Sequence, residues 1–229
     1  MAATTAIFYS KLLVIMRDRL IVIDCETGGL DCEAHSITEV ALRTYDAATL
    51  KEISKYQTYI KPYDDLEITP IAIEKTQVNM KDVLAGVDIK TAVSMLMIEF
   101  KKAKNKSKSL PQIVGHNIGF DIGFLAYAFK RQGKELFDYI NVVPYDTMKM
   151  MRAIEAGIKI EKGSVERFDL TSCCSRMGIK LKSAHGADND VVATHLLFKV
   201  IMEKMRGVNI KVIENKPSEV VKSRNFYQF

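Results

Sequence analysis

A short apolar run followed by two acids constrains this chain more than any other feature. Leu20-Ile21-Val22-Ile23 is continuously apolar, and Asp24-Cys25-Glu26 follows it directly. An apolar run of this length is typical of a central strand whose two faces are both covered. Strand side chains alternate, so Asp24 and Glu26 share one face while Cys25 points into the other layer. The run therefore predicts a buried strand that ends in paired acids, with a turn at Gly28-Gly29.

The rest of the pattern predicts an α/β fold with a mixed sheet. Segments 37–45 and 53–60 alternate apolar and polar residues, which indicates two further strands in an antiparallel meander with the first. Beyond them, helices alternate with short strands. The expected helices cover 88–102, 121–131, a segment from Thr147, 169–177 and 188–205, and the expected strands cover 113–115 and 142–146.

The length of 229 residues favours one domain. We expect an N-terminal extension over 1–17, a catalytic domain over 18–205 and a polar C-terminal tail over 206–229. The apolar stretch near the N-terminus is too short to span a bilayer and lacks a cleavage site, so we expect no membrane association.

The net charge and the cysteine content indicate the class of partner and the redox state of the compartment. The net charge of +5 suits a polyanionic partner, although many enzymes of small molecules are equally basic. The four cysteines match no zinc-binding spacing. They indicate reduced thiols and hence a cytoplasmic location. They are Cys25, Cys32, Cys173 and Cys174.

The paired acids Asp24 and Glu26 repel each other unless a cation neutralises them. Hard carboxylate oxygens suit Mg²⁺ or Mn²⁺. Taken alone, the pair can equally be two solvated acids at the edge of a loop.

Two later segments add acids at the starts of helices. Asp121 opens a predicted helix after a glycine-containing turn, where the helix dipole favours the ionised carboxylate. Its simpler interpretation is helix capping. His185 lies on a loop five residues before Asp190, so it can reach a water at the metal that Asp190 binds; alone, it is equally a surface histidine.

Together, the four carboxylates all fall at strand or helix ends, where an α/β sheet gathers its site. Two divalent ions about 4 Å apart fit among four such groups. His185 is then placed to act as general base toward the attacking water. The sequence therefore predicts two-metal hydrolysis of a phosphodiester.

The chain resembles the DEDDh, or DnaQ-like, family of 3′→5′ exonucleases, which includes the proofreading epsilon subunit of bacterial DNA polymerase III. The resemblance covers about residues 18–205. Its three motifs are Asp24-Cys25-Glu26-Thr27-Gly28-Gly29-Leu30, His116-Asn117-Ile118-Gly119-Phe120-Asp121 and His185-Gly186-Ala187-Asp188-Asn189-Asp190.

The resemblance implies an RNase H-like fold with a five-stranded mixed sheet flanked by helices, and the release of nucleoside 5′-monophosphates. It implies two Mg²⁺ or Mn²⁺ ions bound by Asp24, Glu26, Asp121 and Asp190, with His185 as the base. The positions that it places around the substrate are Thr27, Gly28, Gly29, Glu39, His116, Asn117 and Phe120.

Two departures from the family pattern concern how the nucleotide fits. Gly28 stands where the family usually has a second threonine, and offers the same backbone N–H with more freedom. Gln77 stands where a glycine is common, in the segment that shapes the nucleotide wedge.

The expected substrate is single-stranded nucleic acid or a frayed 3′ end, with DNA in proofreading or repair as the first interpretation. A polymerase or a sliding clamp is a possible partner, through the aromatic C-terminal tail. RNA 3′-end trimming, a non-catalytic nucleic-acid-binding module and an unrelated metal-dependent phosphatase are the alternatives.

Overall fold

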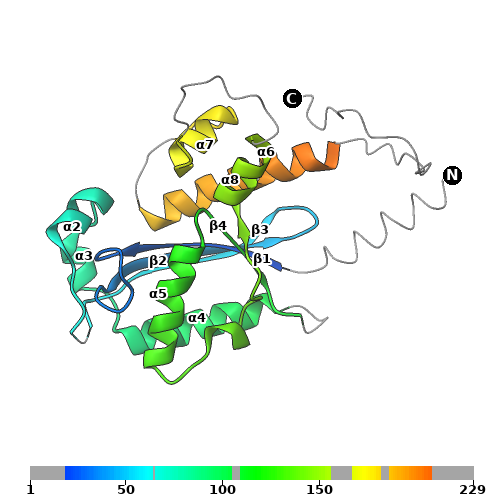
Figure 1. Cartoon of the computed structure of the whole chain (residues 1–229). Coiled ribbons are helices and arrows are strands. Elements are labelled where there is room, and N and C mark those ends of the chain that lie inside the picture. The colour runs from blue at the N-terminus through cyan, green and yellow to red at the C-terminus, as the bar shows by residue number, and fades with distance from the viewer. Residues whose placement is uncertain (1–18, 64, 105–108, 156–166, 182–185, 208–229) are drawn as a thin grey trace, which may run out of the picture.

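A computed structural model describes residues 19–63, 65–104, 109–155, 167–181 and 186–207 of the chain (Figure 1). Its centre is a five-stranded sheet in the order β3-β2-β1-β4-β5. The strands are β1 (Arg19–Thr27), β2 (Ile37–Asp46), β3 (Glu52–Tyr59), β4 (Gln112–Gly115) and β5 (Tyr145–Asp146).

The pairing confirms both the meander and the mixed sheet. β1 pairs antiparallel with β2, and β2 pairs antiparallel with β3. β4 runs parallel to β1, and β5 runs parallel to β4. β1 therefore lies in the middle of the sheet, as its continuous apolar run predicts, and its carboxyl end opens toward the side where β4 and β5 also end.

Helices cover both faces of the sheet (Figure 1). α4 (Ile89–Ala103) and α5 (Gly119–Arg131) lie on one face, and α6 (Thr147–Glu155), α7 (Leu170–Arg176) and α8 (Ala187–Gly207) lie on the other. The shorter α2 (Pro70–Thr76) and α3 (Met80–Leu84) follow β3, and a short 3₁₀ helix, η1 (Leu136–Asp138), follows α5.

The alternation of β1 separates the two cores as predicted. Ile21, Ile23 and Cys25 pack in the core beneath α4 and α5. Leu20 and Val22 pack in the core beneath α8. Asp24 and Glu26 continue the second series, so they face the layer of α8, and Cys25 faces the other layer as expected.

The differences from the predicted elements are local. β5 is confined to Tyr145–Asp146 rather than 142–146, because Pro144 has no N–H to donate to a ladder. α5 begins at Gly119, two residues before the predicted start, so Asp121 lies inside its first turn. α2 and α3 were not predicted, since each is too short to show a helical period.

Gln77 ends α2 in a left-handed conformation with φ of 53°. Glycine adopts that conformation most readily, and glycine is the residue that the family resemblance led us to expect at this position.

Within the described residues, no helix is both long enough and apolar enough to cross a bilayer.

Candidate active site

Three of the four predicted carboxylates meet at one place. Asp24 and Glu26 at the end of β1 and Asp190 in the first turn of α8 each offer an oxygen, and these oxygens lie within 4.8 Å of one another. We call these three residues the acidic centre. The strand alternation that places Asp24 and Glu26 on the α8 face is what allows Asp190, far away in sequence, to join them.

Asp121 is joined to the same strand from the opposite layer. It is 4% exposed. Its Oδ1 accepts a hydrogen bond from the Cys25 backbone N–H at 2.9 Å. It therefore lies behind the end of β1, and its charge acts on both Asp24 and Glu26 across the strand.

The carboxylates of the site are partly or fully buried and repel one another. Burial, and then repulsion from Asp121, Asp190, Glu26 and Glu39, raises the pKa of Asp24 well above its usual value. Burial and the charges of Asp190 and Glu39 raise the pKa of Glu26 to about 7. Burial also raises the pKa of Asp121 to about 7, against the hydrogen bond from Cys25. A divalent cation would relieve this repulsion.

The donor set fits such an ion. Carboxylate oxygens are the hard ligands that Mg²⁺ and Mn²⁺ prefer, and among the described residues the ligand group consists of carboxylates. Cys25, the nearest thiol in sequence, is buried in the opposite core. Its pKa is raised by burial and by the surrounding acids, so it stays a neutral thiol.

Glu39 is buried beside the acidic centre and is not exposed to solvent. It stands opposite Glu26 in the β1–β2 ladder and is 2% exposed. Its Oε1 accepts a hydrogen bond from the Gln57 side chain of β3 at 2.5 Å. Its charge contributes to the raised pKa of Asp24 and of Glu26, so it acts on the site through the ladder and not through an exposed surface.

The turn after β1 is packed against the segment that leads into α2. The Gly28 N–H donates to the Ser36 carbonyl at 2.7 Å, and the Gly28 carbonyl accepts from the Thr69 N–H. A Cβ on Gly28 would lie 2.4 Å from the Glu67 carbonyl oxygen. Glycine at this position therefore serves a close approach of two backbones, and its N–H is already used within the protein.

Thr27 and Gly29 complete this turn. The Thr27 hydroxyl donates to the Gly29 carbonyl at 2.7 Å, and Thr27 is buried. A Cβ on Gly29 would meet the ring of His35 at 2.3 Å. His35 follows the turn at 32–34, forms an isolated β-bridge with Glu67, and contacts the Asp31 carbonyl through Nδ1 at 2.9 Å.

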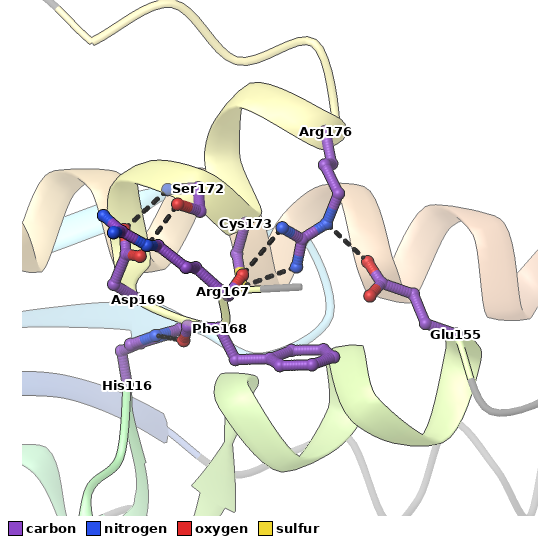
Figure 2. A network of polar contacts seen from close by, with 8 residues as sticks. All are labelled: His116, Glu155, Arg167, Phe168, Asp169, Ser172, Cys173 and Arg176. Atoms are coloured by element: carbon purple, nitrogen blue, oxygen red, sulfur yellow. Dashed lines mark hydrogen bonds and ion pairs between the residues drawn. The ribbon is translucent and has the colours of Figure 1, made fainter. Parts of the chain in front are cut away.

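His116 is held by two contacts inside the protein, of which Figure 2 shows the one with Phe168. Its Nε2 lies 2.8 Å from the Phe168 carbonyl oxygen, and its Nδ1 lies 2.9 Å from the Thr147 hydroxyl. The carbonyl can only accept, so Nε2 carries a proton. The Thr147 hydroxyl lies beside Nδ1 and also donates to the Gly115 carbonyl at 3.2 Å. Burial lowers the pKa of His116, which favours the neutral form.

Phe168 in turn is fixed by a small network around α7 (Figure 2). The guanidinium of Arg176 lies 5.1 Å from the centre of its ring and that of Arg152 lies 5.2 Å away. Arg176 also donates to Glu155 at 2.7 Å and to the Arg167 carbonyl at 2.7 Å. The chain entering α7 is thereby tied to α6 and, through His116, to the end of β4.

Asn117 and Phe120 flank the start of α5. Asn117 has a φ of 59°, is exposed, and donates its N–H to Asp146 Oδ1 at 3.0 Å. Phe120 is half-buried and packs on Phe124, with ring centres 4.9 Å apart. Of the predicted positions around the substrate, Asn117 has the most exposed side chain.

Asp146 is a residue of the site that the sequence did not reveal. It ends β5, is 5% exposed, and accepts from the Asn117 and Met148 N–H groups. Its charge also contributes to the raised pKa of Asp121. An aspartate directly before a predicted helix was the available signal, but capping alone accounts for such a residue.

The start of α8 is built around Gly186, which has a φ of 113°. Its carbonyl accepts from the N–H groups of Asn189 and Asp190, and its own N–H bonds to Glu26 and lowers the pKa of that carboxyl. Asp188, in the first turn of α8, pairs with Arg43 of β2. His185 lies outside the described residues, and its predicted role stays a prediction.

Comparison with known proteins agrees with this architecture. The exonuclease family model RNase_T matches residues 21–198. Ribonuclease T of Shewanella frigidimarina is 27% identical over 195 residues, covering 82% of this chain and 84% of that protein. The 3′-5′ exonuclease DinG of Bacillus subtilis is 26% identical over 198 residues, covering 83% of this chain but 18% of that protein.

Among solved structures, E. coli Exonuclease I in complex with a dT13 oligonucleotide superposes with a TM-score of 0.68. It is 22% identical, and the match covers 80% of this chain and 41% of that one. The RNase H-like fold expected from the sequence is thereby confirmed. The chain spans less than half of the Exonuclease I chain and most of Ribonuclease T.

Proposed function

The chain belongs to the RNase_T exonuclease family and is a 3′→5′ exonuclease of the DnaQ-like type, and from this premise we propose that it removes nucleotides from the 3′ ends of single-stranded DNA in proofreading or repair. The observation that carries the proposal is the acidic centre, in which three carboxylate oxygens lie within 4.8 Å of one another. Such a cluster suits divalent cations and is unfavourable without them.

In this proposal, Asp24, Glu26, Asp121 and Asp190 hold two Mg²⁺ or Mn²⁺ ions. When bound, divalent ions neutralise the charge that develops on the phosphate and make water a better nucleophile at neutral pH. The protein fixes the carboxylates from three directions: Asp24 and Glu26 by the end of β1, Asp121 by the Cys25 N–H, and Asp190 by the first turn of α8.

His185 takes the proton of the attacking water in this proposal. The neutral imidazole is the appropriate base near pH 7, since its ordinary pKa is about 6.5. His185 directly precedes Gly186 in the sequence, and the Gly186 N–H bonds to Glu26. The position next to Gly186 supports the assignment, and the proposal assigns His116 no proton transfer because both of its nitrogens are engaged.

Two exposed apolar side chains support a nucleic acid over a mononucleotide as substrate. Leu30, directly after Gly28-Gly29, is 84% exposed, and Ile71 at the start of α2 is 67% exposed. Gly28 joins the two segments that carry them. An apolar rim beside a phosphate-hydrolysing site can pack against the bases of a strand. Thr27, Gly29, Asn117 and Phe120 are proposed to line the terminal nucleotide below this rim.

RNA is the second candidate substrate, and one observation favours it. Ribonuclease T matches over most of both chains, whereas DinG and the PolC-type DNA polymerase III of Halalkalibacterium halodurans match over 18% and 12% of their lengths. DNA as the first candidate is supported by the oligodeoxynucleotide complexes of Exonuclease I and by the PolC relative.

The substrate test uses matched 5′-labelled single strands made of DNA, of RNA, and of DNA with one 3′-terminal ribonucleotide, each with Mg²⁺ or with chelator. The proposal predicts a ladder that shortens from the 3′ end, fastest on DNA and absent with chelator. Faster shortening of RNA assigns the chain to RNA trimming. Release of phosphate from mononucleotides without shortening contradicts the exonuclease proposal for this site.

A polymerase or sliding-clamp partner remains part of the proposal. It is supported by the PolC-type relative, in which a matching segment forms part of a DNA polymerase, and by the aromatic residues Phe226, Tyr227 and Phe229. The tail that carries these residues, and the proposed extension over 1–17, lie outside the described residues. A pull-down of the full chain against its truncation at residue 207 tests this role.

A further inference from the structure

Arg43 of β2 joins three elements of the α8 face. Its Nε and one terminal nitrogen donate to the two carboxylate oxygens of Asp188 at 2.8 and 2.7 Å. Its other terminal nitrogen donates to Glu52 of β3 at 2.6 Å. The contact with Asp188 is therefore a pair of parallel hydrogen bonds between a planar guanidinium and a carboxylate, which fixes direction as well as distance. We call this contact the Arg43 fork.

The ion pair between Arg43 and Asp188 is partly buried from solvent, which helps it to keep a defined geometry. The Arg43 side chain is 15% exposed and that of Asp188 is 28% exposed, whereas Glu52 is 41% exposed. Arg43 lies on the same face of β2 as Glu39, four residues away, and stands opposite Val22 of β1 in the ladder. It is thus anchored in the middle of the sheet rather than on a flexible loop.

Asp188 lies two residues before Asp190 in the first turn of α8. At about 100° per residue, the two side chains point in directions about 200° apart around the helix axis. One side of the turn is therefore held by Arg43, while the other carries the carboxylate that completes the acidic centre. A rotation of this turn would move Asp190 relative to Asp24 and Glu26.

Apolar packing and polar contacts both hold this turn. Ala187 and Val191 are fully buried in the core beneath α8. The N–H groups of Asn189 and Asp190 bond to the Gly186 carbonyl, and Gly186 has the backbone conformation of a glycine with φ of 113°. These are contacts within the turn itself. The contact of Arg43 with Asp188 adds a polar link between this turn and the sheet, and its two parallel hydrogen bonds give a fixed direction that apolar packing does not give.

We propose that Arg43 is a positioning residue of the metal site: its two-pronged contact with Asp188 sets the orientation of the first turn of α8 and thereby the place of Asp190 in the acidic centre. The inference rests on the proposed function, because it assigns Asp190 to metal binding. Arg43 touches neither substrate nor ion in this account; it acts through Asp188.

The test measures Mn²⁺ binding by calorimetry on the full-length protein, together with thermal unfolding in chelator. Arg43→Gln and Asp188→Asn each break the fork from one side. Each is expected to weaken Mn²⁺ affinity by about tenfold, the effect typical of residues that orient metal ligands. The double variant is expected to bind no more weakly than either single variant, since both changes remove the same contact.

Two further variants separate orientation from charge and from general stability. Glu52→Gln removes the other partner of Arg43 without touching α8, and is expected to leave Mn²⁺ affinity within about twofold of wild type. Arg43→Lys keeps the charge but cannot form the fork, so it is expected to bind Mn²⁺ nearly as weakly as Arg43→Gln. At saturating Mn²⁺, Arg43→Gln should shorten a 3′ end at the wild-type rate. This result would separate a loss of Mn²⁺ affinity from a loss of hydrolysis rate.

Wild-type affinity in Arg43→Gln, even with a lowered unfolding temperature, would overturn the proposal and leave Arg43 a structural residue. Strictly additive losses in the double variant would overturn it as well. The proposed function fails in a different way: wild-type protein that binds no Mn²⁺ contradicts the metal site itself. Wild-type protein that binds Mn²⁺ without shortening a strand contradicts only the exonuclease proposal.

Discussion

The Asp121 carboxylate accepts a hydrogen bond from the backbone N–H of Cys25 at 2.9 Å. This contact joins the first turn of α5 to the strand residue that lies between Asp24 and Glu26. It places a buried carboxylate behind the acidic centre, where burial and the neighbouring acids raise its pKa to about 7. The same arrangement that prepares the site for cations therefore opposes the stability of the cation-free fold.

Asp121→Asn separates these two effects. The amide oxygen can still accept from Cys25, so the fold is kept while the charge is lost. We expect 3′-end hydrolysis to fall by about 100-fold or more, beyond the loss typical of a residue that only orients a ligand. In chelator at pH 8 we expect the variant to unfold at a higher temperature than wild type, because a buried charge is gone. Unchanged hydrolysis would remove Asp121 from the site.

His116→Ala tests whether this histidine is structural. The change removes the donor to the Phe168 carbonyl and the contact with the Thr147 hydroxyl, which keeps its hydrogen bond to the Gly115 carbonyl. We expect a loss of about 1–3 kcal/mol in the free energy of unfolding. The shape of the pH–rate profile should stay that of wild type, since the His116 proton is not transferred. Loss of one limb of that profile would show that His116 does act as an acid or base.

The buried side chain of His195 makes the free energy of unfolding depend on pH. It is buried in α8 and stacks on Tyr45, with ring centres 3.7 Å apart. Burial lowers its pKa to about 4, against about 6.5 in the unfolded chain. The unfolded chain then binds more protons between these values, so His195 makes stability fall as pH falls through this window.

His195→Phe keeps an aromatic ring against Tyr45 and removes this titration. We expect the variant to lose less stability than wild type between pH 6.5 and pH 4, as measured by denaturant unfolding at several pH values. The two proteins should respond alike above pH 7.5. Parallel curves throughout the acid range would show that His195 does not contribute.

Gly28→Ala tests the close approach at the turn after β1. The added methyl group would lie 2.4 Å from the Glu67 carbonyl oxygen and 2.8 Å from the Ile68 Cα, both backbone atoms that cannot swing away. We expect a loss of about 1–3 kcal/mol in unfolding free energy. Gly123→Ala in α5 is the matched control, because its methyl group meets nothing within 4 Å. The control should gain about 0.5–1 kcal/mol.

The sequence predicted the parts of this molecule that follow from local periodicity. The continuous apolar run placed β1 in the centre of the sheet, and the alternation of its side chains placed Cys25 in one layer and Asp24 and Glu26 in the other. The meeting of Asp190 with these two acids was expected because strand and helix ends gather at one edge of an α/β sheet.

Contacts between distant segments could not be predicted in the same way. Arg43 and Asp188 are separated by 145 residues, and nothing in either neighbourhood marks them as partners. The role of His116 depends on the Phe168 carbonyl, a backbone atom that any residue would supply. Gly28 looked like a freely available N–H for a nucleotide, whereas its N–H and carbonyl are both engaged within the protein.

Wild-type protein and Asp24→Asn should be compared, on the same preparations, for Mn²⁺ binding by calorimetry and for shortening of a 5′-labelled single strand. Wild type should bind Mn²⁺ and shorten the strand from its 3′ end. Asp24→Asn should stay folded, bind Mn²⁺ far more weakly and leave the strand intact. Shortening by Asp24→Asn at the wild-type rate, or by wild type in chelator, would contradict the assignment of the acidic centre as the catalytic metal site.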